Sequence, residues 1–265
     1  MVGKLGHDKF VSLKEDTHQY FDQNNDEYKS VSYLLSKVKM PFPRKERSYQ
    51  MAKSQLPSNA TAEEIGVEQN RILESWDILA KSSTDWGTYV HGNLEAYFTI
   101  GSCDDKDVLR AAQSIGQYFS NVESFLPELI VYDSQFKLAG TMDLGVLRKR
   151  GSKPHTTILD IFDFKTNERR GIEFDTSYIK NGIYNAGGKY MLPPVEHLEE
   201  CNYNVYSLQL SLYALMVQNT YKVKIGRLGI LFIDKSMNVD LFPVPYLKYE
   251  AMQLFELLTE IKQLP

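Results

Sequence analysis

The segment from Thr156 to Lys165 constrains the fold more than any other part of the chain. Its residues are mostly branched and aromatic, as is typical of β-strands, and its apolar middle favours a central strand of a sheet. Charged residues in such a strand need partners, because an unpaired buried charge is costly. Side chains alternate along a strand, so Asp163 and Lys165 should share one face, while Phe162 and Phe164 pack on the other.

Further strands and helices are expected on both sides of this segment. A short basic link joins it to the strand before it, which predicts a hairpin. Residues 166–200 contain Gly, Pro and Asn throughout, so we expect an irregular insertion with at most one short helix. Periodicity predicts the remaining elements, with strands at 127–132, 136–147, 227–234 and 239–243 and helices at 61–81, 83–98, 104–125, 204–219 and 246–263.

This order of elements predicts an α/β fold with a central mixed sheet flanked by helices. Near the N-terminus, alternating aromatic and polar residues surround Asn24-Asn-Asp26, which indicates a β-hairpin followed by a short helix. We expect residues 1–60 to form this N-terminal hairpin and a basic segment, and residues 61–265 to form the core. A chain of 265 residues with 43% hydrophobic content can bury one sizeable core with a small lobe.

Charge is unevenly distributed along the chain. The formal net charge is −4 and the pI is near 5.8, so no global basic field points to a polyanionic partner. Seven basic residues against one acid nevertheless fall between Lys29 and Lys53, and a second basic segment runs from Arg148 to Lys153. Such local patches can supply contacts to phosphates. The candidates for these contacts are Lys37, Lys39, Arg44, Arg148 and Lys149.

The two cysteines, Cys103 and Cys201, lie in different segments and form no CxxC or Cys/His pair. This usage fits a reducing compartment. The N-terminal residues lack the apolar region of a secretion signal, and no apolar run reaches the length of a membrane span. We therefore expect a cytoplasmic protein, in the host cell if the protein is viral.

Two carboxylates are predicted to meet at the end of the sheet. Gly140-Thr-Met-Asp143 lies in the strand before Asp163, and the hairpin would place the two strands side by side. Paired Asp side chains offer the hard oxygen ligands that Mg²⁺ and Mn²⁺ prefer. Either motif alone would fit strand-end acids beside a solvated lysine. The apolar strand around Asp163 favours a shared cation instead, since buried acids without one are expensive.

Two helices carry further candidates. His91 and Glu95 lie one turn apart on one helix face, with Gly87 one turn earlier, and a neutral imidazole there could bind a metal. A satisfied core histidine is the alternative. Gln209 and Tyr213 also lie one turn apart and could hold a phosphate or a water molecule without adding charge. An ordinary amphipathic helix with two polar positions is the alternative there.

Five sequence features follow one another between Gly87 and Ala214. They are GxxxHxxxE around His91, the acid Glu128, GTxD ending at Asp143, DFKT starting at Asp163 and QLxxYA starting at Gln209. In this order they resemble the RecB-like branch of the PD-(D/E)XK nuclease superfamily, and phage exonucleases of that branch. The segment Lys189-Tyr-Met-Leu-Pro-Pro and the N-terminal hairpin region extend the resemblance to most of the chain.

The resemblance implies a restriction-endonuclease-like fold and a centre with one or two Mg²⁺ or Mn²⁺ ions. His91, Asp143 and Asp163 would bind the metal together with the backbone carbonyl of Phe164, and Glu128 would be an outer or second-metal ligand. Some relatives carry four cysteines for an iron–sulfur cluster. The two cysteines of this chain cannot supply that set, so no cluster is expected.

The resemblance also implies roles in catalysis. Lys165 would position the attacking water and stabilise developing charge, and Gln209 and Tyr213 would orient the phosphate. Asp143 and Asp163 complete the predicted catalytic set.

The expected function is therefore a metal-dependent deoxyribonuclease acting on DNA, and an exonuclease in particular. A structure-specific endonuclease with the same centre and a non-catalytic DNA-binding protein that retains the fold are the alternatives. A viral recombination or replication role, with a recombinase or helicase as partner, follows from the resemblance alone. Tyr20, Phe21 and Tyr28 of the hairpin could stack on bases of single-stranded DNA or pack in the core.

Overall fold

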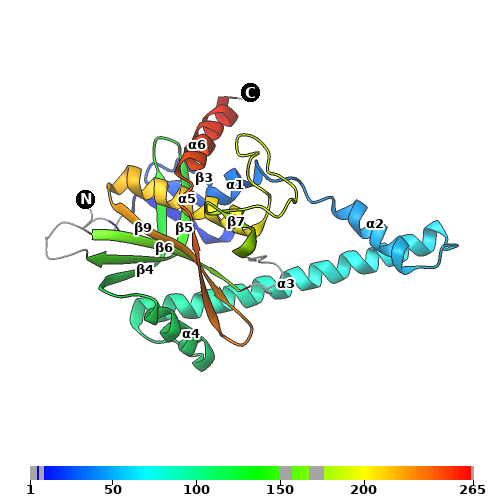
Figure 1. The fold of residues 1–265 in the computed structure, drawn as a ribbon, viewed down its shortest axis with the longest axis horizontal. Coiled ribbons are helices and arrows are strands. Elements are labelled where there is room, and N and C mark those ends of the chain that lie inside the picture. The colour runs from blue at the N-terminus through cyan, green and yellow to red at the C-terminus, as the bar shows by residue number, and fades with distance from the viewer. Residues whose placement is uncertain (1–4, 6–8, 150–156, 167–175, 264–265) are drawn as a thin grey trace. The chain divides into compact units, whose positions relative to one another are not determined.

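A computed structural model describes residues 5, 9–149, 157–166 and 176–263 (Figure 1). The chain forms two compact units. The main unit consists of Met1–Lys39 and Val90–Pro265, and the helical unit consists of Met40–Tyr89. The division into residues 1–60 and 61–265 stays a prediction.

The main unit is built on an eight-stranded sheet in the order β1-β2-β3-β5-β6-β9-β10, with β4 also paired to β5. The β3–β5 and β6–β9 pairs are parallel and the others are antiparallel, which confirms the predicted mixed sheet flanked by helices. The strands are β1 (Val11–Lys14), β2 (Gln19–Asp22), β3 (Glu27–Ser30), β4 (Val122–Asp133), β5 (Leu138–Lys149), β6 (Thr157–Lys165), β9 (Lys224–Ile233) and β10 (Val239–Val244).

Strand β6 is central, as predicted, because it pairs with β5 on one edge and with β9 on the other. Phe162 and Phe164 are each 1% exposed. Their rings pack against Phe119 and Phe98 on one face of the sheet. The opposite face is covered by α5 (Asn202–Tyr221), whose side chains reach Asp163 and Lys165 and which contributes many residues to the main core (Figure 1). The alternation expected from the sequence is confirmed.

The GTxD motif occupies a gap in the pairing of β5. One edge of β5 follows β4 throughout, but the other edge pairs first with β3, up to Ala139, and then with β6, from Leu144. Residues 140–143 lie between these two ladders. Their backbone and side chains are therefore available for contacts with α5 and with the end of β6.

The helices before the sheet differ from the prediction in two ways. Instead of separate helices at 61–81 and 83–98, one helix, α3 (Ala62–Ile100), runs through. The Ser82-Ser-Thr84 stretch contains no proline, and the Thr84 hydroxyl donates to the carbonyl of Ala80 at 3.0 Å within the helix. The predicted helix at 104–125 ends early. Asp105 caps α4 (Lys106–Gln117), and Asn121 with φ 56° turns the chain into β4.

The helical unit consists of α2 (Arg44–Gln55) and the part of α3 up to Tyr89. A capping box begins α3, since the Thr61 hydroxyl accepts from the Glu64 amide at 3.2 Å and the Glu64 carboxylate accepts from the Thr61 amide at 2.7 Å. A small core holds the two helices together, and its buried members are Ala52, Ile65 and Ile72.

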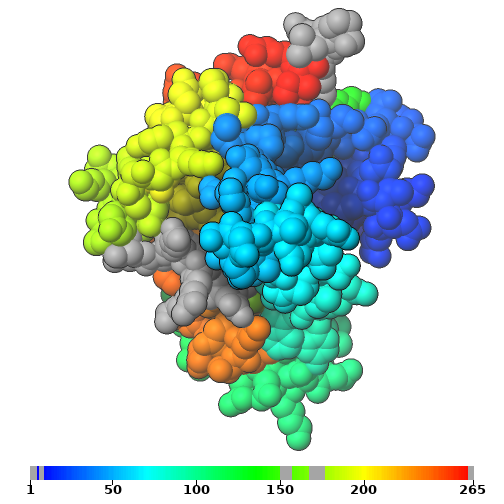
Figure 2. Space-filling view, turned by 90° about the vertical axis from the view of Figure 1, so that its right-hand side faces the viewer, coloured from blue at the N-terminus to red at the C-terminus, as the bar shows by residue number. Residues whose placement is uncertain are grey.

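The described part of the insertion, residues 176–200, is largely irregular, and its surface is the yellow and yellow-green area of Figure 2. It contains a 3₁₀ turn (Thr176–Tyr178) and two short strands, β7 (Ile179–Lys180) and β8 (Ile183–Tyr184). Buried Asn204 of α5 holds this segment by bonds to Tyr184 and Glu199 at 2.9–3.1 Å. The amide of Leu192 donates to the carbonyl of Val38 at 2.8 Å, next to α1 (Val31–Ser36). Helix α6 (Lys248–Gln263) ends the described chain.

Candidate metal centre

Three side chains from a helix and two strands meet at the gap in β5. Ligand atoms of His91 on α3, Glu128 on β4 and Asp143 on β5 all lie within 4.8 Å of one another. The imidazole Nδ1 of His91 is 3.8 Å from an Asp143 carboxylate oxygen, and 13% of the Asp143 side chain is exposed. An imidazole and two carboxylates within this distance could hold a metal ion.

The Asp143 side chain takes the place of a backbone hydrogen-bond acceptor at the end of β6. Its carboxylate accepts a hydrogen bond from the Phe164 amide at 2.6 Å, beyond the last β5–β6 pair, Leu144–Phe162. Burial raises the pKa of Asp143 well above its usual range, and the nearby charge of Asp163 raises it further. The site therefore concentrates negative charge, which a bound cation would offset.

Glu128 has an unusual backbone conformation. It lies on β4 between Pro127 and Leu129, which pair with Leu144 and Met142, so it faces Asp143 across the ladder. Its φ of 45° is rare for a residue other than glycine inside a strand. Burial, followed by repulsion from Glu95 and Asp163, raises the pKa of Glu128 to about 7. Such strain and crowding of acids are typical of functional sites.

His91 is placed to act as a neutral ligand. Burial lowers the pKa of His91, and the opposing influences of Asp163 and of a backbone hydrogen bond with Phe164 do not reverse the shift. The ring of Phe164 meets the imidazole edge to face, with 5.6 Å between ring centroids. A neutral imidazole has a nitrogen lone pair for a metal, whereas a protonated one does not.

Asp163 and Lys165 form an ion pair beside these three residues. The Gln209 amide donates to the other Asp163 carboxylate oxygen at 3.1 Å. Burial alone would lower the pKa of Lys165, but Asp163 and Asp143 raise it, so the ammonium stays charged. The ammonium also lies 4.6 Å from the centroid of the Tyr206 ring. Asp163 is not part of the three-residue group among the described residues, so its role as a metal ligand stays a prediction.

Tyr213 lies on the same face of α5 as Gln209. Its hydroxyl accepts from the Gln209 amide at 3.2 Å, and burial, then Asp163 and Asp143, raise the pKa of the phenol well above its ordinary value. The ring rests on Gly140, where an added Cβ would lie 2.6 Å from a Tyr213 ring carbon. The glycine of the GTxD motif is therefore required by the close approach of Tyr213.

We expect Gly140→Ala to destabilise the protein by about 1–3 kcal/mol, because the new methyl group would displace the Tyr213 ring. Chemical denaturation measures the change. Gly116→Ala in α4 is the matched control, since a Cβ there meets nothing within 4 Å and alanine favours a helix. Equal stabilities of the two variants would contradict this packing.

The basic candidates Lys37, Arg148 and Lys149 of the main unit contact residues outside this centre. Arg148 makes two hydrogen bonds, at 2.7 and 2.9 Å, to buried Asp160. The Lys149 ammonium lies 3.5 Å from the Glu123 carboxylate, and Lys37 lies over the Tyr33 ring. In the helical unit, Arg44 pairs with Asp77 at 2.6 Å. Lys39 is exposed. Their contacts with DNA stay predictions, and residues 150–156 of the second basic segment lie outside the described residues.

Two aromatic residues of the hairpin, Tyr20 and Tyr28, belong to the core. Tyr20 and Tyr28 are 3% and 2% exposed, so these two rings pack in the core, and stacking on bases is excluded for them. The Tyr20 hydroxyl shares a hydrogen bond of 3.0 Å with Thr141 in the gap of β5. The hairpin thus contacts the GTxD segment that carries Asp143.

Sequence reasoning missed two neighbours of the centre. Tyr206 lies three residues before Gln209 on the same face of α5, and this spacing could have identified it. Glu95 was placed on the face of His91 without a role, yet its charge acts on Glu128. Glu128 itself was expected only as an outer or second-metal ligand.

Comparisons with known proteins give likenesses to solved structures alone. The chain matches no family model and no curated protein. It is similar to a crystal structure from Eubacterium rectale named "Putative exonuclease", with 17% sequence identity and a TM-score of 0.36, over 88% of this chain and 79% of that one. The function proposed below therefore rests on the geometry of the site.

Two further observations concern the rest of the chain. Among the described residues, no helix is both long and apolar enough to cross a membrane. Cys103 and Cys201 are both half-buried and are not joined in a disulfide.

Proposed function

We propose that this protein is a metal-dependent deoxyribonuclease of the PD-(D/E)XK superfamily, RecB-like branch, that hydrolyses phosphodiester bonds in DNA. The observation that carries the proposal is the approach of His91, Glu128 and Asp143 to within 4.8 Å, next to the Asp163–Lys165 ion pair. A hard cation and a fixed ammonium group are the two parts that phosphodiester hydrolysis needs in such a centre.

The donor set fits Mg²⁺ or Mn²⁺. Both ions accept carboxylate oxygens, and Mn²⁺ also accepts imidazole nitrogen. Burial and repulsion by neighbouring carboxylates raise the pKa of both Glu128 and Asp143, so a cation would stabilise their charged forms. When bound, the metal would supply a water molecule of lowered pKa and neutralise charge on the phosphate.

The side chains around the metal ligands would act on the substrate. Lys165, held by Asp163 and by the ring of Tyr206, would place positive charge where negative charge grows on the phosphate oxygens. Gln209 and Tyr213 are linked by a hydrogen bond, and they would orient the phosphate with an amide and a phenol. Asp143 and Asp163 complete the proposed catalytic set.

We propose further that the enzyme is an exonuclease in the cytoplasm and that Lys37, Lys39, Arg44, Arg148 and Lys149 contribute contacts to DNA phosphates. The motif resemblance supports the exonuclease assignment and the division into a DNA-binding segment 1–60 and a nuclease core 61–265. A recombinase or helicase partner belongs to the same proposal.

One assay tests the activity. End-labelled single- and double-stranded DNA is incubated with the protein and Mg²⁺, Mn²⁺ or EDTA. We expect cleavage of linear DNA with either metal and none with EDTA, while closed circular DNA survives. Cleavage of the circle would assign an endonuclease instead, and failure to cut with both metals would overturn the proposal.

We expect Glu128→Gln to weaken Mn²⁺ binding at least about tenfold, because a ligand carboxylate becomes a neutral amide. Calorimetric titration measures the affinity and the number of ions, independently of DNA cleavage. Glu123→Gln on the same strand is the matched control, since Glu123 lies near Lys149 at the surface. Wild-type affinity of the Glu128 variant would remove this residue from the centre.

A further inference from the structure

Residues 140–143 of β5 lack a strand neighbour on one edge. Among the strands that the structure describes, β3 pairs with β5 only before this segment and β6 only after it. Buried backbone needs other partners where a ladder is interrupted, so side chains must hold the segment on this edge. The Asp143 carboxylate accepts from the Phe164 amide at 2.6 Å, and the Tyr213 ring closes on Gly140. The position of this segment decides where the Asp143 carboxylate lies.

Tyr20 reaches the segment from β2, which is separated from β5 by β3. Its hydroxyl shares a hydrogen bond of 3.0 Å with the Thr141 hydroxyl. Side chains alternate along a strand, so Thr141 and Asp143 share one face of β5. Tyr20 is 3% exposed, so its bond to Thr141 lies in the interior, away from bulk water. The bond therefore attaches the unpaired edge of β5 to the core of the N-terminal hairpin.

The charge of the metal centre acts on the Tyr20 hydroxyl. Burial raises the pKa of the Tyr20 phenol, the hydrogen bond with Thr141 opposes this, and the charge of Glu128 raises the pKa further. Tyr20 is also among the groups that raise the pKa of Tyr213, after the larger effect of burial. The Tyr20 phenol therefore keeps its proton at neutral pH and remains a hydrogen-bond partner for Thr141.

We propose that Tyr20 is a positioning residue of the metal centre. Through Thr141 it fixes the unpaired edge of β5 and thereby the direction of the Asp143 carboxylate. A residue outside the ligand set can change metal affinity in this way, because outer contacts restrict the ligands to one orientation. The inference rests on the metal centre of the proposed function but not on DNA cleavage.

Calorimetric titration of the full chain with Mn²⁺ tests this role. Tyr20→Phe keeps the ring and removes the hydroxyl, and we expect Mn²⁺ to bind about three- to tenfold more weakly, the effect of one lost hydrogen bond. Thr141→Val should show the same loss, and Thr141→Ser should bind as the wild type does. The double variant of Tyr20→Phe and Thr141→Val should lose no more than either single variant, because both changes remove the same bond. Wild-type affinity in Tyr20→Phe would overturn the inference and leave the metal centre in place.

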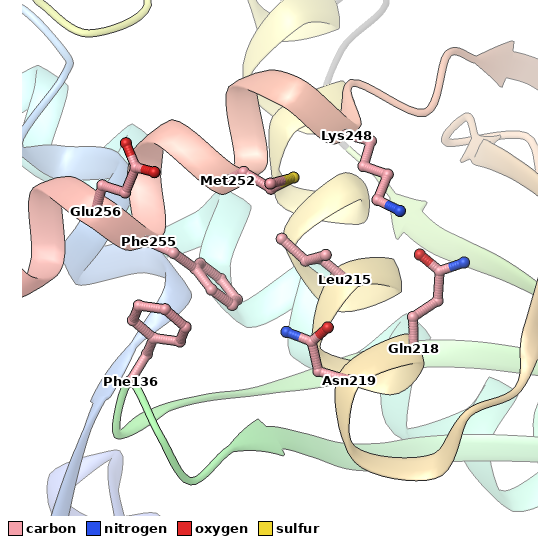
Figure 3. Close-up of a pocket in the computed structure, with 8 residues that line it drawn as sticks. All are labelled: Phe136, Leu215, Gln218, Asn219, Lys248, Met252, Phe255 and Glu256. Carbon is pink, nitrogen blue, oxygen red and sulfur yellow. The ribbon is translucent and has the colours of Figure 1, made fainter.

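Tyr28 offers the matched control. It pairs with Tyr20 across β2 and β3, is 2% exposed, and donates from its hydroxyl to Ser134 at 3.3 Å in the turn after β4. Phe136 of the same turn lines a cavity of about 440 Å³ with residues of α5 and α6, and none of the lining residues belongs to the metal centre (Figure 3). Tyr28→Phe should therefore lose a similar amount of stability in urea, since each variant loses one hydroxyl bond, but should keep its Mn²⁺ affinity. An equal loss of Mn²⁺ affinity in both variants would show general packing by the hairpin and overturn the specific role of Tyr20.

A second measurement needs no metal. The Phe164 amide donates to Asp143, so its exchange with solvent, followed by NMR in the metal-free protein, reports on the position of the carboxylate. We expect exchange to be about three- to tenfold faster in Tyr20→Phe and unchanged in Tyr28→Phe. Faster exchange in Tyr20→Phe, together with a wild type that does not bind Mn²⁺, would count against the proposed function but support the positioning of Asp143. Unchanged exchange in Tyr20→Phe would overturn the positioning.

Discussion

Cleavage of DNA by Lys165→Ala protein should be slower than wild-type cleavage by about 100-fold or more, the cost of losing a single transition-state contact. The ammonium group is held in place by Asp163 and by the Tyr206 ring. Single-turnover cleavage of end-labelled DNA at saturating Mg²⁺ measures the effect.

Metal binding separates this role from a structural one. Lys165 is not among the ligand group of His91, Glu128 and Asp143, so the variant should bind Mn²⁺ at least as tightly as the wild type, since a nearby positive charge is removed. Lys165→Gln, which keeps most of the side-chain length without the positive charge, should lose the same activity. Lys106→Ala is the control. Wild-type cleavage by either Lys165 variant would refute the assignment.

Asp163→Asn should still bind DNA but not cut it with Mg²⁺, because the amide cannot hold the Lys165 ammonium as a carboxylate does. Retention of full cleavage would remove Asp163 from the catalytic set.

The largest expected loss of stability comes from Asp160→Ala. Asp160 is fully buried in β6, where its carboxylate accepts four hydrogen bonds of 2.7–2.9 Å from the Arg148 side chain and from the backbone and side chain of Arg227. Gly226 permits this approach, since a Cβ there would lie 2.1 Å from the carboxylate. Breaking a buried ion pair from one side costs about 3–5 kcal/mol. Urea denaturation at pH 7 measures the free energy of unfolding.

The matched control is Glu123→Gln, which removes a surface ion pair with Lys149, the neighbour of Arg148. We expect a change below about 1 kcal/mol there. Similar losses in the two variants would show that the Asp160 cluster is not a major source of stability.

The contribution of Asp160 should also depend on pH. Burial would raise its pKa, but the arginine contacts outweigh this, and the pKa of Asp160 is lowered in the folded protein. Its stabilisation is therefore fully present above the unfolded value of about 3.9 and is lost as the pH falls through the lower folded value. The difference in unfolding free energy between the wild type and Asp160→Ala should shrink over that range.

Local patterns in the sequence predicted most of the elements correctly. Strand β6 was recognisable because five of its nine residues are apolar or aromatic and Asp163 and Lys165 alternate with phenylalanines. The break predicted between two helices was wrong, because serine and threonine lower helix propensity by too little to end a helix. The end of α4 was misplaced because residues 118–125 contain aromatic side chains that suit either a helix or a strand.

By itself, the sequence determined the α/β order of elements, the shared face of Asp163 and Lys165, and the pairing of their strand with the strand of Asp143. The first two follow from periodicity, which acts over a few residues, and the pairing follows from the short link between the two strands. Only the tertiary structure decided that Glu128 joins His91 and Asp143, that Tyr206 lies under Lys165, and that Arg148 donates hydrogen bonds to Asp160. Each of these depends on strand register and on helices packing across the sheet, and such long-range contacts have no local pattern to reveal them.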